Sequence, residues 1–417
     1  MFVTLPNYHM KKFNVPAAYR SSLISAIKNK RRQNDKLKKD FAPTLLDFGE
    51  VQFYLARHFG FCYGVENAIE ISFKTVEENP DKKIYLLSEM IHNPLVNDDL
   101  KKRGVQFLMD TKGNHIVPFD HIHAGDIVII PAFGTTLEME ERLKEKQIEV
   151  AKYNTTCPFV EKVWNRAEAI AKNNYSIVVH GKPQHEETKA TFSHSAFRAP
   201  TVVVNDMKET IELAKYITGE KPKENFYNEF AGRFSKDFNI EKDLQRIGVV
   251  NQTTMLASDT QAIADYLKQV MIKKYHLSEK NISDHFADTR DTLCYATYEN
   301  QTAVYELLNT DADFAIVVGG YNSSNTSHLV ELCEEKYATY FIRSANEIIS
   351  SKEIHHFNLH KKEEVISLSY LPEKKPARIL ITSGASCPDA LVEEVIEKII
   401  SFYKVSKNIE EITKEYQ

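Results

Sequence analysis

Gly60-Phe61-Cys62-Tyr63-Gly64-Val65 is the most informative segment of this 417-residue chain, because a β-rich run precedes it and a helical pattern follows it. Glycines on both sides of the cysteine let the backbone turn tightly. The same order of strand, polar loop and helix recurs at Asn154-Thr155-Thr156-Cys157-Pro158, at Gly319-Gly320-Tyr321-Asn322-Ser323-Ser324-Asn325 and at Thr382-Ser383-Gly384-Ala385-Ser386. Repeated strand–loop–helix units predict an α/β fold with mainly parallel sheets.

Ten short runs around these segments have the composition of β-strands. They span 52–56, 83–87, 126–130, 176–179, 201–204, 247–250, 314–318, 339–342, 364–367 and 378–381. Many are continuously apolar, which is typical of strands covered on both faces. Open α/β sheets bind ligands beyond the carboxyl ends of their strands, so we expect the polar loops to carry the chemistry.

The composition narrows the class of protein. A net charge of −5 and a pI near 6.3 give no overall nucleic-acid signature. No apolar run approaches the ~20 residues needed to span a bilayer, and the N-terminus lacks the apolar core of a signal peptide. Five cysteines without a Cys-x-x-Cys pair do not suggest a disulfide scaffold. We therefore expect a cytoplasmic protein with no membrane and no nucleic-acid partner.

The first fifty residues, 1–50, are a basic N-terminal extension. A short amphipathic helix is predicted near 19–27, and a run rich in lysine and arginine follows it. The favoured interpretation is a solvated extension, and the alternatives are a weak nucleic-acid arm or a targeting segment. Asp35 and Asp40 count against a transit peptide, which is usually poor in acidic residues.

Three of the cysteines, Cys62, Cys157 and Cys294, lie where a strand ends and a helix begins. A helix N-terminus favours a thiolate, and Pro158 suits the first position of a helix. Three thiolates suit either a zinc site or a four-iron cluster with one iron left open. Distant ligands without a local pair favour the open cluster, although spacing alone leaves both alternatives. Cys387 and Cys333 are expected to be packed thiols.

Polar side chains on the other loops could receive an anionic substrate. His92 and His185 could bind phosphate oxygens, and Glu187 could relay protons. Neutral donors at helix starts could hold an anion without a basic patch, and Thr253 adds a hydroxyl. The neutral donors are Asn322, Ser323, Ser324, Asn325 and Ser386. Each residue alone could instead be a helix cap or a structural histidine. Neither a P-loop nor a dinucleotide fingerprint is present.

Together these segments resemble the 4-hydroxy-3-methylbut-2-enyl diphosphate reductase family, the last enzymes of the non-mevalonate isoprenoid pathway. The similarity runs in order from about 51 to about 400. To the loops quoted above it adds Glu89-Met90-Ile91-His92-Asn93-Pro94, His185-Glu186-Glu187-Thr188, Asn251-Gln252-Thr253-Thr254 and Cys294-Tyr295-Ala296-Thr297. Three features are similar to those of the plant and cyanobacterial branch of the family. They are the basic extension, the segment Pro131-Ala132-Phe133-Gly134 and the His-Glu-Glu-Thr motif.

The resemblance implies a trefoil of three similar α/β units around a central iron–sulfur site. We place the first unit at 51–156, completed by 387–406. The second is placed at 157–293 with an insertion about 220–243, and the third at 294–386, before a tail at 407–417. The implied cofactor is one [4Fe–4S] cluster with three cysteine ligands, Cys62, Cys157 and Cys294, and an open iron.

The implied activity is reductive dehydroxylation of the allylic diphosphate to isopentenyl and dimethylallyl diphosphates. By the resemblance, Glu187 relays protons and Thr253 helps hold the substrate hydroxyl. The implied diphosphate ligands are His92, His185, Ser323, Ser324, Asn325 and Ser386, and Asn322 and Thr253 are also expected to bind the substrate. The expected electron donor is a ferredoxin or flavodoxin.

One residue departs from the wider family pattern, in which a third diphosphate-binding histidine is common. Phe133 stands there and cannot donate a hydrogen bond, so we expect Gly134, Thr135, Thr136 or the backbone to hold the phosphate at this position. Two other readings stay open. One is a related three-cysteine trefoil enzyme such as quinolinate synthase, and the other is a non-catalytic cluster or zinc sensor that uses the basic arm to bind nucleic acid.

Overall fold

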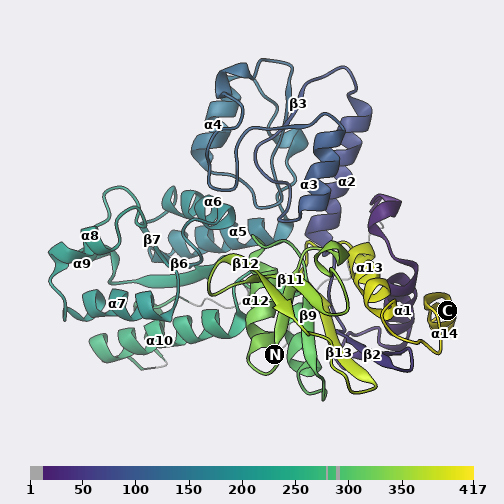
Figure 1. Ribbon diagram of the computed structural model, residues 1–417. Helices are drawn as coiled ribbons and strands as arrows, with labels where there is room; N and C mark the ends of the chain where they lie inside the picture. The colour runs from purple at the N-terminus through teal and green to yellow at the C-terminus, as the bar shows by residue number, and fades with distance from the viewer. Residues whose placement is uncertain (1–12, 279, 288–291) are drawn as a thin grey trace.

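The computed structural model describes residues 13–278, 280–287 and 292–417, which form three lobes around a common centre (Figure 1). Each lobe has its own sheet with helices packed on it. The predicted fold class, α/β with mainly parallel sheets, is confirmed. Within the described residues, no helix combines the length and the apolar character needed to cross a membrane.

The first lobe contains a three-stranded parallel sheet of order β4-β3-β5, and every residue of β3 and β5 is buried. Its strands are β3 (Ile84–Leu86), β4 (Gln106–Phe107) and β5 (Ile127–Ile129), and its helices are α2 (Tyr63–Glu78), α3 (Pro94–Lys102) and α4 (Leu137–Glu145). The two-residue strand β4 was not predicted, because so short a run has no recognisable periodicity.

The second lobe contains the parallel sheet β7-β6-β8. Its elements are α5 (Pro158–Lys172), β6 (Ser176–His180), α6 (Glu186–Ala196), β7 (Thr201–Val204), α7 (Met207–Thr218), α8 (Phe226–Glu229), α9 (Ile240–Asp243), β8 (Ile247–Asn251) and α10 (Ala257–Tyr275). The segment predicted to be an insertion packs onto this lobe, where Phe226 stacks on Phe230 and Phe238 at centroid distances of 5.0 and 5.5 Å.

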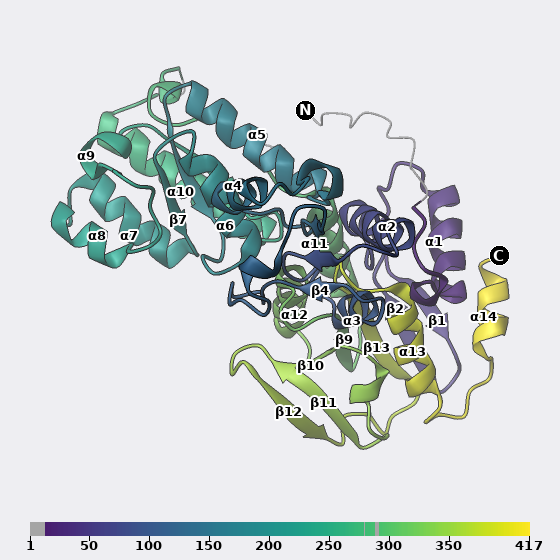
Figure 2. The same cartoon turned by 90° about the horizontal axis from the view of Figure 1, so that it is seen from above.

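The third lobe contains a five-stranded sheet of order β1-β2-β13-β9-β10, in which only β1 is antiparallel to its neighbour. The strands are β1 (Thr44–Asp47), β2 (Val51–Leu55), β9 (Phe314–Val318), β10 (Thr339–Ile342) and β13 (Ala377–Ser383). The helices are α1 (Ser22–Asn34), α11 (Tyr295–Leu307), α12 (Ser324–Glu334), α13 (Asp389–Ile400) and α14 (Ile409–Glu415). A hairpin of β11 (Glu353–Asn358) and β12 (Glu363–Leu368) projects from it (Figure 2).

The structure corrects the predicted boundaries of the units. Strand β2, which was placed in the first unit, pairs with β13, and its Phe53 lies opposite Ile379. Helix α13 was expected to complete the first unit, yet Val392 and Val395 lie in the core of the five-stranded sheet. The tail at 407–417 forms α14, whose Ile412 belongs to the same core. Boundaries drawn in chain order fail here because a sheet can recruit strands from both ends of the chain.

The N-terminal extension, where it is described, is solvated only in part: helix α1 packs on the third lobe, whereas most of residues 32–40 are exposed. Leu23 and Ile24 of α1 are fully buried in the core of the third lobe. Lys28 forms an ion pair with Asp389 of α13 at 2.7 Å. The apolar face of the predicted helix is therefore covered by the third lobe, which a charge count could not reveal. Residues 1–12 lie outside the described part of the extension.

The three lobes direct their loops toward the middle of the molecule. Seen from above, α5 runs inward from the second lobe toward the region where α2 and α11 lie (Figure 2). Short 3-10 turns complete the connections, at Ala17–Tyr19, Phe119–His121, Ala151–Tyr153, Lys223–Asn225, Ile282–Asp284 and Ala345–Glu347. The central pocket is therefore built from loops of all three lobes.

Candidate active site

Three cysteines that are far apart in the sequence line one central pocket. Each is the N-cap residue of a helix: Cys62 of α2, Cys157 of α5 and Cys294 of α11. The thiols lie close enough for charge on one to raise the pKa of the next. A methyl group added to Gly64 would lie 2.3 Å from Cys157 Sγ, so only glycine leaves room for this thiol.

The backbone amides of the first helical turn face each sulfur. Burial raises the pKa of all three thiols, that of Cys294 to about 12, and the hydrogen-bonding amides oppose this shift. The amides belong to Gly64 and Val65, to Phe159 and Val160, and to Ala296 and Thr297. Three mutually repelling thiolates in such a place require a cationic partner, and the amides would support sulfur bound to metal.

The spacing of the thiols bears on the size of that partner. In the described part of the chain, no group of three or more His, Cys, Asp or Glu side chains is arranged to hold a single metal ion. A four-iron cluster binds each thiolate through a different iron, so its ligands surround a cavity and do not meet at a point. Three cysteines around one pocket match the ligand set that such a cluster would need.

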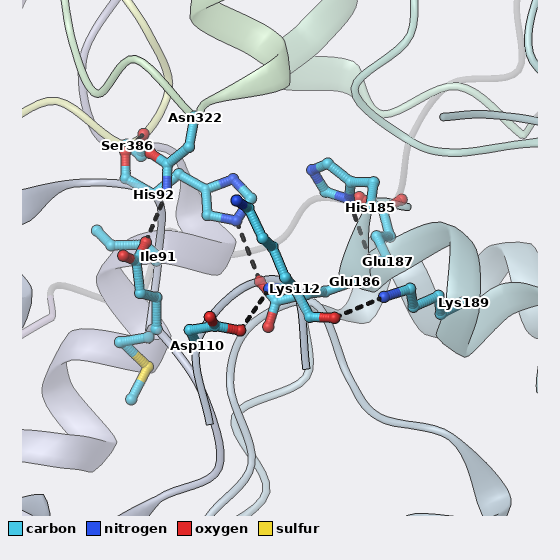
Figure 3. A network of polar contacts seen from close by, with 12 residues as sticks. Ile91, His92, Asp110, Lys112, His185, Glu186, Glu187, Lys189, Asn322 and Ser386 are labelled. Carbon is cyan, nitrogen blue, oxygen red and sulfur yellow. Dashed lines mark hydrogen bonds and ion pairs between the residues drawn. The ribbon is translucent and has the colours of Figure 1, made fainter. Parts of the chain in front are cut away.

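Two adjacent glutamates at the start of α6 have different environments. Glu187 is 1% exposed, and its Oε1 accepts a hydrogen bond from the backbone N–H of Thr253 at 2.5 Å. Burial raises the pKa of Glu187 to about 7, although the bonds from Thr253 act in the opposite direction. Glu186 lies outside the lining and contacts His92 Nε2 at 3.2 Å (Figure 3). Glu187 is thus the carboxylate that can exchange a proton with a ligand near neutral pH.

Three rings form one wall of the pocket. Phe133 stacks on His92 with a centroid distance of 4.2 Å, and His92 meets His185 edge-on at 5.0 Å. His185 caps α6, because its Nδ1 accepts from the backbone N–H of Glu187 at 3.2 Å. This bond leaves His185 Nε2 buried and without a hydrogen-bond partner. Phe133 therefore supports the histidine rings but offers no polar atom.

The loops of the third lobe add further polar groups that lack partners. Asn325 Oδ1 accepts from Ala385 N at 2.9 Å, yet Asn325 Nδ2 and Ser324 Oγ are buried and have no hydrogen-bond partner among the described residues. Ser323 caps α12, and Ser386 Oγ donates to the His92 carbonyl at 3.3 Å. Buried polar atoms are nearly always hydrogen-bonded, so unpaired donors in a pocket lining indicate a polar ligand.

Most of the residues proposed from the sequence therefore lie together, with one exception. Asn322 is absent from the lining, and its Nδ2 donates to Glu89 Oε2 at 2.8 Å (Figure 3). Cys333 and Cys387 are fully buried in the core of the third lobe. Thr254, one of the hydroxyl residues that follow β8 in the sequence, and Thr297 also line the pocket, and Thr297 was not among the predicted site residues. Thr297 could have been found, because it lies three residues after Cys294 on the same face of its helix.

Comparison with known proteins agrees with this geometry. Residues 53–400 match the LytB protein family. A Prochlorococcus marinus subsp. pastoris protein named 4-hydroxy-3-methylbut-2-enyl diphosphate reductase is 40% identical over 389 residues, which cover 93% of this chain and 92% of that one. A Cyanothece protein of the same name is 37% identical over 409 residues, covering 96% and 95% of the two chains.

Solved structures show the same fold. One, described as (E)-4-hydroxy-3-methyl-but-2-enyl diphosphate reductase, the terminal enzyme of the non-mevalonate pathway, is 25% identical and has a TM-score of 0.50 over 83% of this chain and 98% of its own. A Plasmodium falciparum reductase, 22% identical, has a TM-score of 0.60 over 88% and 98% of the two chains. The predicted trefoil is confirmed, and by its sequence and its fold this chain belongs to the LytB protein family.

Proposed function

We propose that this chain reduces 4-hydroxy-3-methylbut-2-enyl diphosphate to isopentenyl and dimethylallyl diphosphates. The reaction removes the allylic hydroxyl group as water and consumes two electrons and two protons. The observation that carries the proposal is the central pocket, where three cysteines from three helix starts face unpaired polar atoms. Relatives that carry this name cover more than nine tenths of the chain.

Cys62, Cys157 and Cys294 are the proposed ligands of one [4Fe–4S] cluster with an open iron. When bound, the cluster would supply the electrons one at a time and a Lewis-acidic iron for the leaving oxygen. The protein contributes the helix N-termini and first-turn amides around the sulfurs, which favour thiolates. Gly64 leaves the space that Cys157 occupies.

The diphosphate is proposed to bind at the polar side of the pocket. His185 Nε2, Ser324 Oγ and Asn325 Nδ2 are the unpaired donors that its oxygens would satisfy. His92, Ser323 and Ser386 line the same side. The contact of Asn322 with Glu89 favours a supporting role for Asn322, in which it orients that carboxylate beside the pocket.

Glu187 and Thr253 are proposed to deliver protons. A carboxyl group with a pKa near 7 can be protonated before the reaction and can donate during it. Because the hydrogen bond from Thr253 N holds Glu187 Oε1, the carboxyl group keeps a fixed direction in the pocket. Thr253 and Glu187 both line the pocket, so the hydroxyl of Thr253 could transfer the proton from Glu187 to the substrate.

The proposed partner is a low-potential electron donor of the ferredoxin or flavodoxin type. Thiol-bound clusters and free thiols persist in reducing compartments. None of the five cysteines forms a disulfide with another described residue, which supports the proposed cytoplasmic location.

The test is turnover by anaerobically reconstituted protein with reduced methyl viologen and the allylic diphosphate. Both C5 diphosphates should appear, and a holoprotein with about four iron atoms per chain that yields neither would refute the proposal. Quinolinate formation from dihydroxyacetone phosphate and iminoaspartate would support the alternative trefoil enzyme instead. Activity lost in Glu187→Gln with unchanged iron content would argue against a sensor.

A further inference from the structure

The diphosphate end of the pocket has little positive charge of its own. Among the described residues that line the pocket there is neither a lysine nor an arginine. Two carboxylates lie beside it: Glu186 contacts His92 at 3.2 Å, and Glu89 accepts from Asn322 at 2.8 Å. The carboxylate of Glu186 therefore adds negative charge beside His92. A diphosphate carries several negative charges, so a cation beside the lining would favour its binding.

Phe133 also adds no positive charge to this part of the pocket. Its ring fills the space beside His92 at 4.2 Å and lies edge-on to His185 at 5.6 Å. A phenyl ring in this position excludes water and holds the imidazoles, but it neither donates a hydrogen bond nor carries charge. Phe133 therefore contributes neither a donor nor a charge to this wall of the pocket.

Lys112 lies on the turn of residues 110–114 in the first lobe. Asp110 Oδ1 accepts from the backbone N–H groups of Lys112 and Asn114 at 2.9 and 2.8 Å, and Gly113 has a φ of +93°. Hydrogen bonds from Asn114 hold the pKa of Asp110 below its usual range, which keeps the carboxylate ionised. The backbone of Lys112 is thus well fixed. Its side chain is exposed and, among the described residues, has no carboxylate within ion-pair distance.

A second contact ties this turn to the lobe that supplies the histidine and the proton donor. Lys189 of α6 donates from Nζ to the carbonyl of Lys112 at 3.3 Å. Helix α6 has His185 as its N-cap and begins with Glu186 and Glu187. The turn of the first lobe therefore contacts the helix whose first residues help to line the pocket. In the view of Figure 3 the side chain of Lys112 passes over Glu186 in the direction of His92.

We propose that Lys112 binds the diphosphate as a rim cation and supplies the charged donor that Phe133 cannot. Its ammonium group would donate to terminal phosphate oxygens from the solvent side, opposite the neutral donors Ser324 and Asn325. The proposal rests on the proposed function, because it names the residue that holds the tail of that substrate. Asp110 and Lys189 are positioning residues for this lysine.

The test measures binding and turnover with the reconstituted holoprotein. Calorimetric titration with inorganic pyrophosphate should show an affinity roughly tenfold weaker in Lys112→Ala, which is the effect of losing one charge-assisted hydrogen bond. The KM for the allylic diphosphate should rise by a similar factor while kcat changes little, since Lys112 touches only the tail. Lys112→Arg should retain most of the affinity, and Phe133→His in the Lys112→Ala background should restore part of it.

A matched control is Lys102→Ala on α3 of the same lobe. The exposed ammonium group of Lys102 pairs with Asp99 at 3.8 Å, and its removal should leave the pyrophosphate affinity unchanged. Pyrophosphate affinity within twofold of the unsubstituted protein in Lys112→Ala would overturn the assignment. So would an equal loss in Lys102→Ala, which would indicate a general charge effect. Holoprotein that binds pyrophosphate but never reduces the allylic diphosphate would refute the proposed function, and the role of Lys112 would then be judged on binding alone.

Discussion

Gly64 and Cys157 illustrate how closely the pocket is built at the scale of single residues. The absent side chain of Gly64, two residues after Cys62, is the space into which the thiol of Cys157 projects. Gly64 belongs to helix α2, where alanine would be the better helix former. The glycine is therefore explained by the neighbouring sulfur and not by the helix.

Gly64→Ala should prevent normal cluster assembly. The new methyl group would lie 2.3 Å from Cys157 Sγ, so one of the two helix starts must move. We expect iron content and visible absorption to fall about as far as in Cys157→Ser. Cys333→Ser is the control, because Cys333 is buried in the core of the third lobe and should leave the iron content unchanged. A fully loaded Gly64→Ala protein would contradict the ligand assignment.

The rate of the chemical step should depend on pH through Glu187. Burial raises the pKa of this carboxyl group to about 7, so the proton-donating form dominates below that pH. Single-turnover rates should therefore be level on the acidic side and fall about tenfold per pH unit well above 7. Glu187→Gln should be nearly inactive and should lose this pH profile.

Glu186→Gln is the matched control for the pH profile, because Glu186 contacts His92 and lies outside the lining. It should keep the fall in rate above pH 7 even if its KM changes. A profile that vanished in Glu186→Gln and persisted in Glu187→Gln would reverse the two roles.

At the scale of elements, helix α1 makes part of the basic extension a packed element of the third lobe. Ser21 caps the helix by accepting from Ile24 N at 2.8 Å, and the apolar residues that follow lie on the face that meets the third lobe. Cys62 starts α2 close to the contact between Lys28 and Phe59 O at 2.9 Å. The described part of the extension is therefore a structural part of the third lobe.

Leu23→Ala should destabilise the third lobe by about 2–5 kcal/mol, because Leu23 is fully buried and the truncation leaves a cavity. Urea unfolding of the holoprotein would measure the change. Lys36→Ala, on the exposed segment that follows the helix, should alter stability by no more than ~0.5 kcal/mol. Equal stability of both variants would show that α1 adds nothing to the core.

At the scale of the whole molecule, the pocket depends on how closely the lobes approach each other. A methyl group on Gly320 would lie 2.3 Å from the carbonyl oxygen of His92, which belongs to the first lobe. Ser386 Oγ bonds to the same carbonyl at 3.3 Å. The loops of the first and third lobes therefore meet at one backbone oxygen beside the proposed diphosphate site.

Gly320→Ala should separate these loops and raise the KM for the allylic diphosphate at least tenfold, because small misplacements of binding groups are costly. Steady-state kinetics of the holoprotein would measure this, with its melting temperature as the control for folding. A KM within twofold of the unsubstituted protein would show that the lobes can move apart without loss of binding.

The sequence by itself determined the local events. Apolar runs located the ten predicted strands, and glycine, proline and polar caps located the helix starts on which the three cysteines lie. These signals act over a few residues, so they can be read without knowing the fold. The family resemblance supplied the trefoil and the proposed roles, which no single motif carried.

Only the tertiary structure decided which distant segments meet. Strand β2 pairs with β13 from the other end of the chain, and α1 became part of the core although its composition predicted a solvated arm. The tertiary structure also gave the two adjacent glutamates different neighbours, with Glu187 buried beside Thr253 and Glu186 in contact with His92. Burial, pairing and pKa are properties of neighbours brought together by folding, and adjacent letters in a sequence do not carry them.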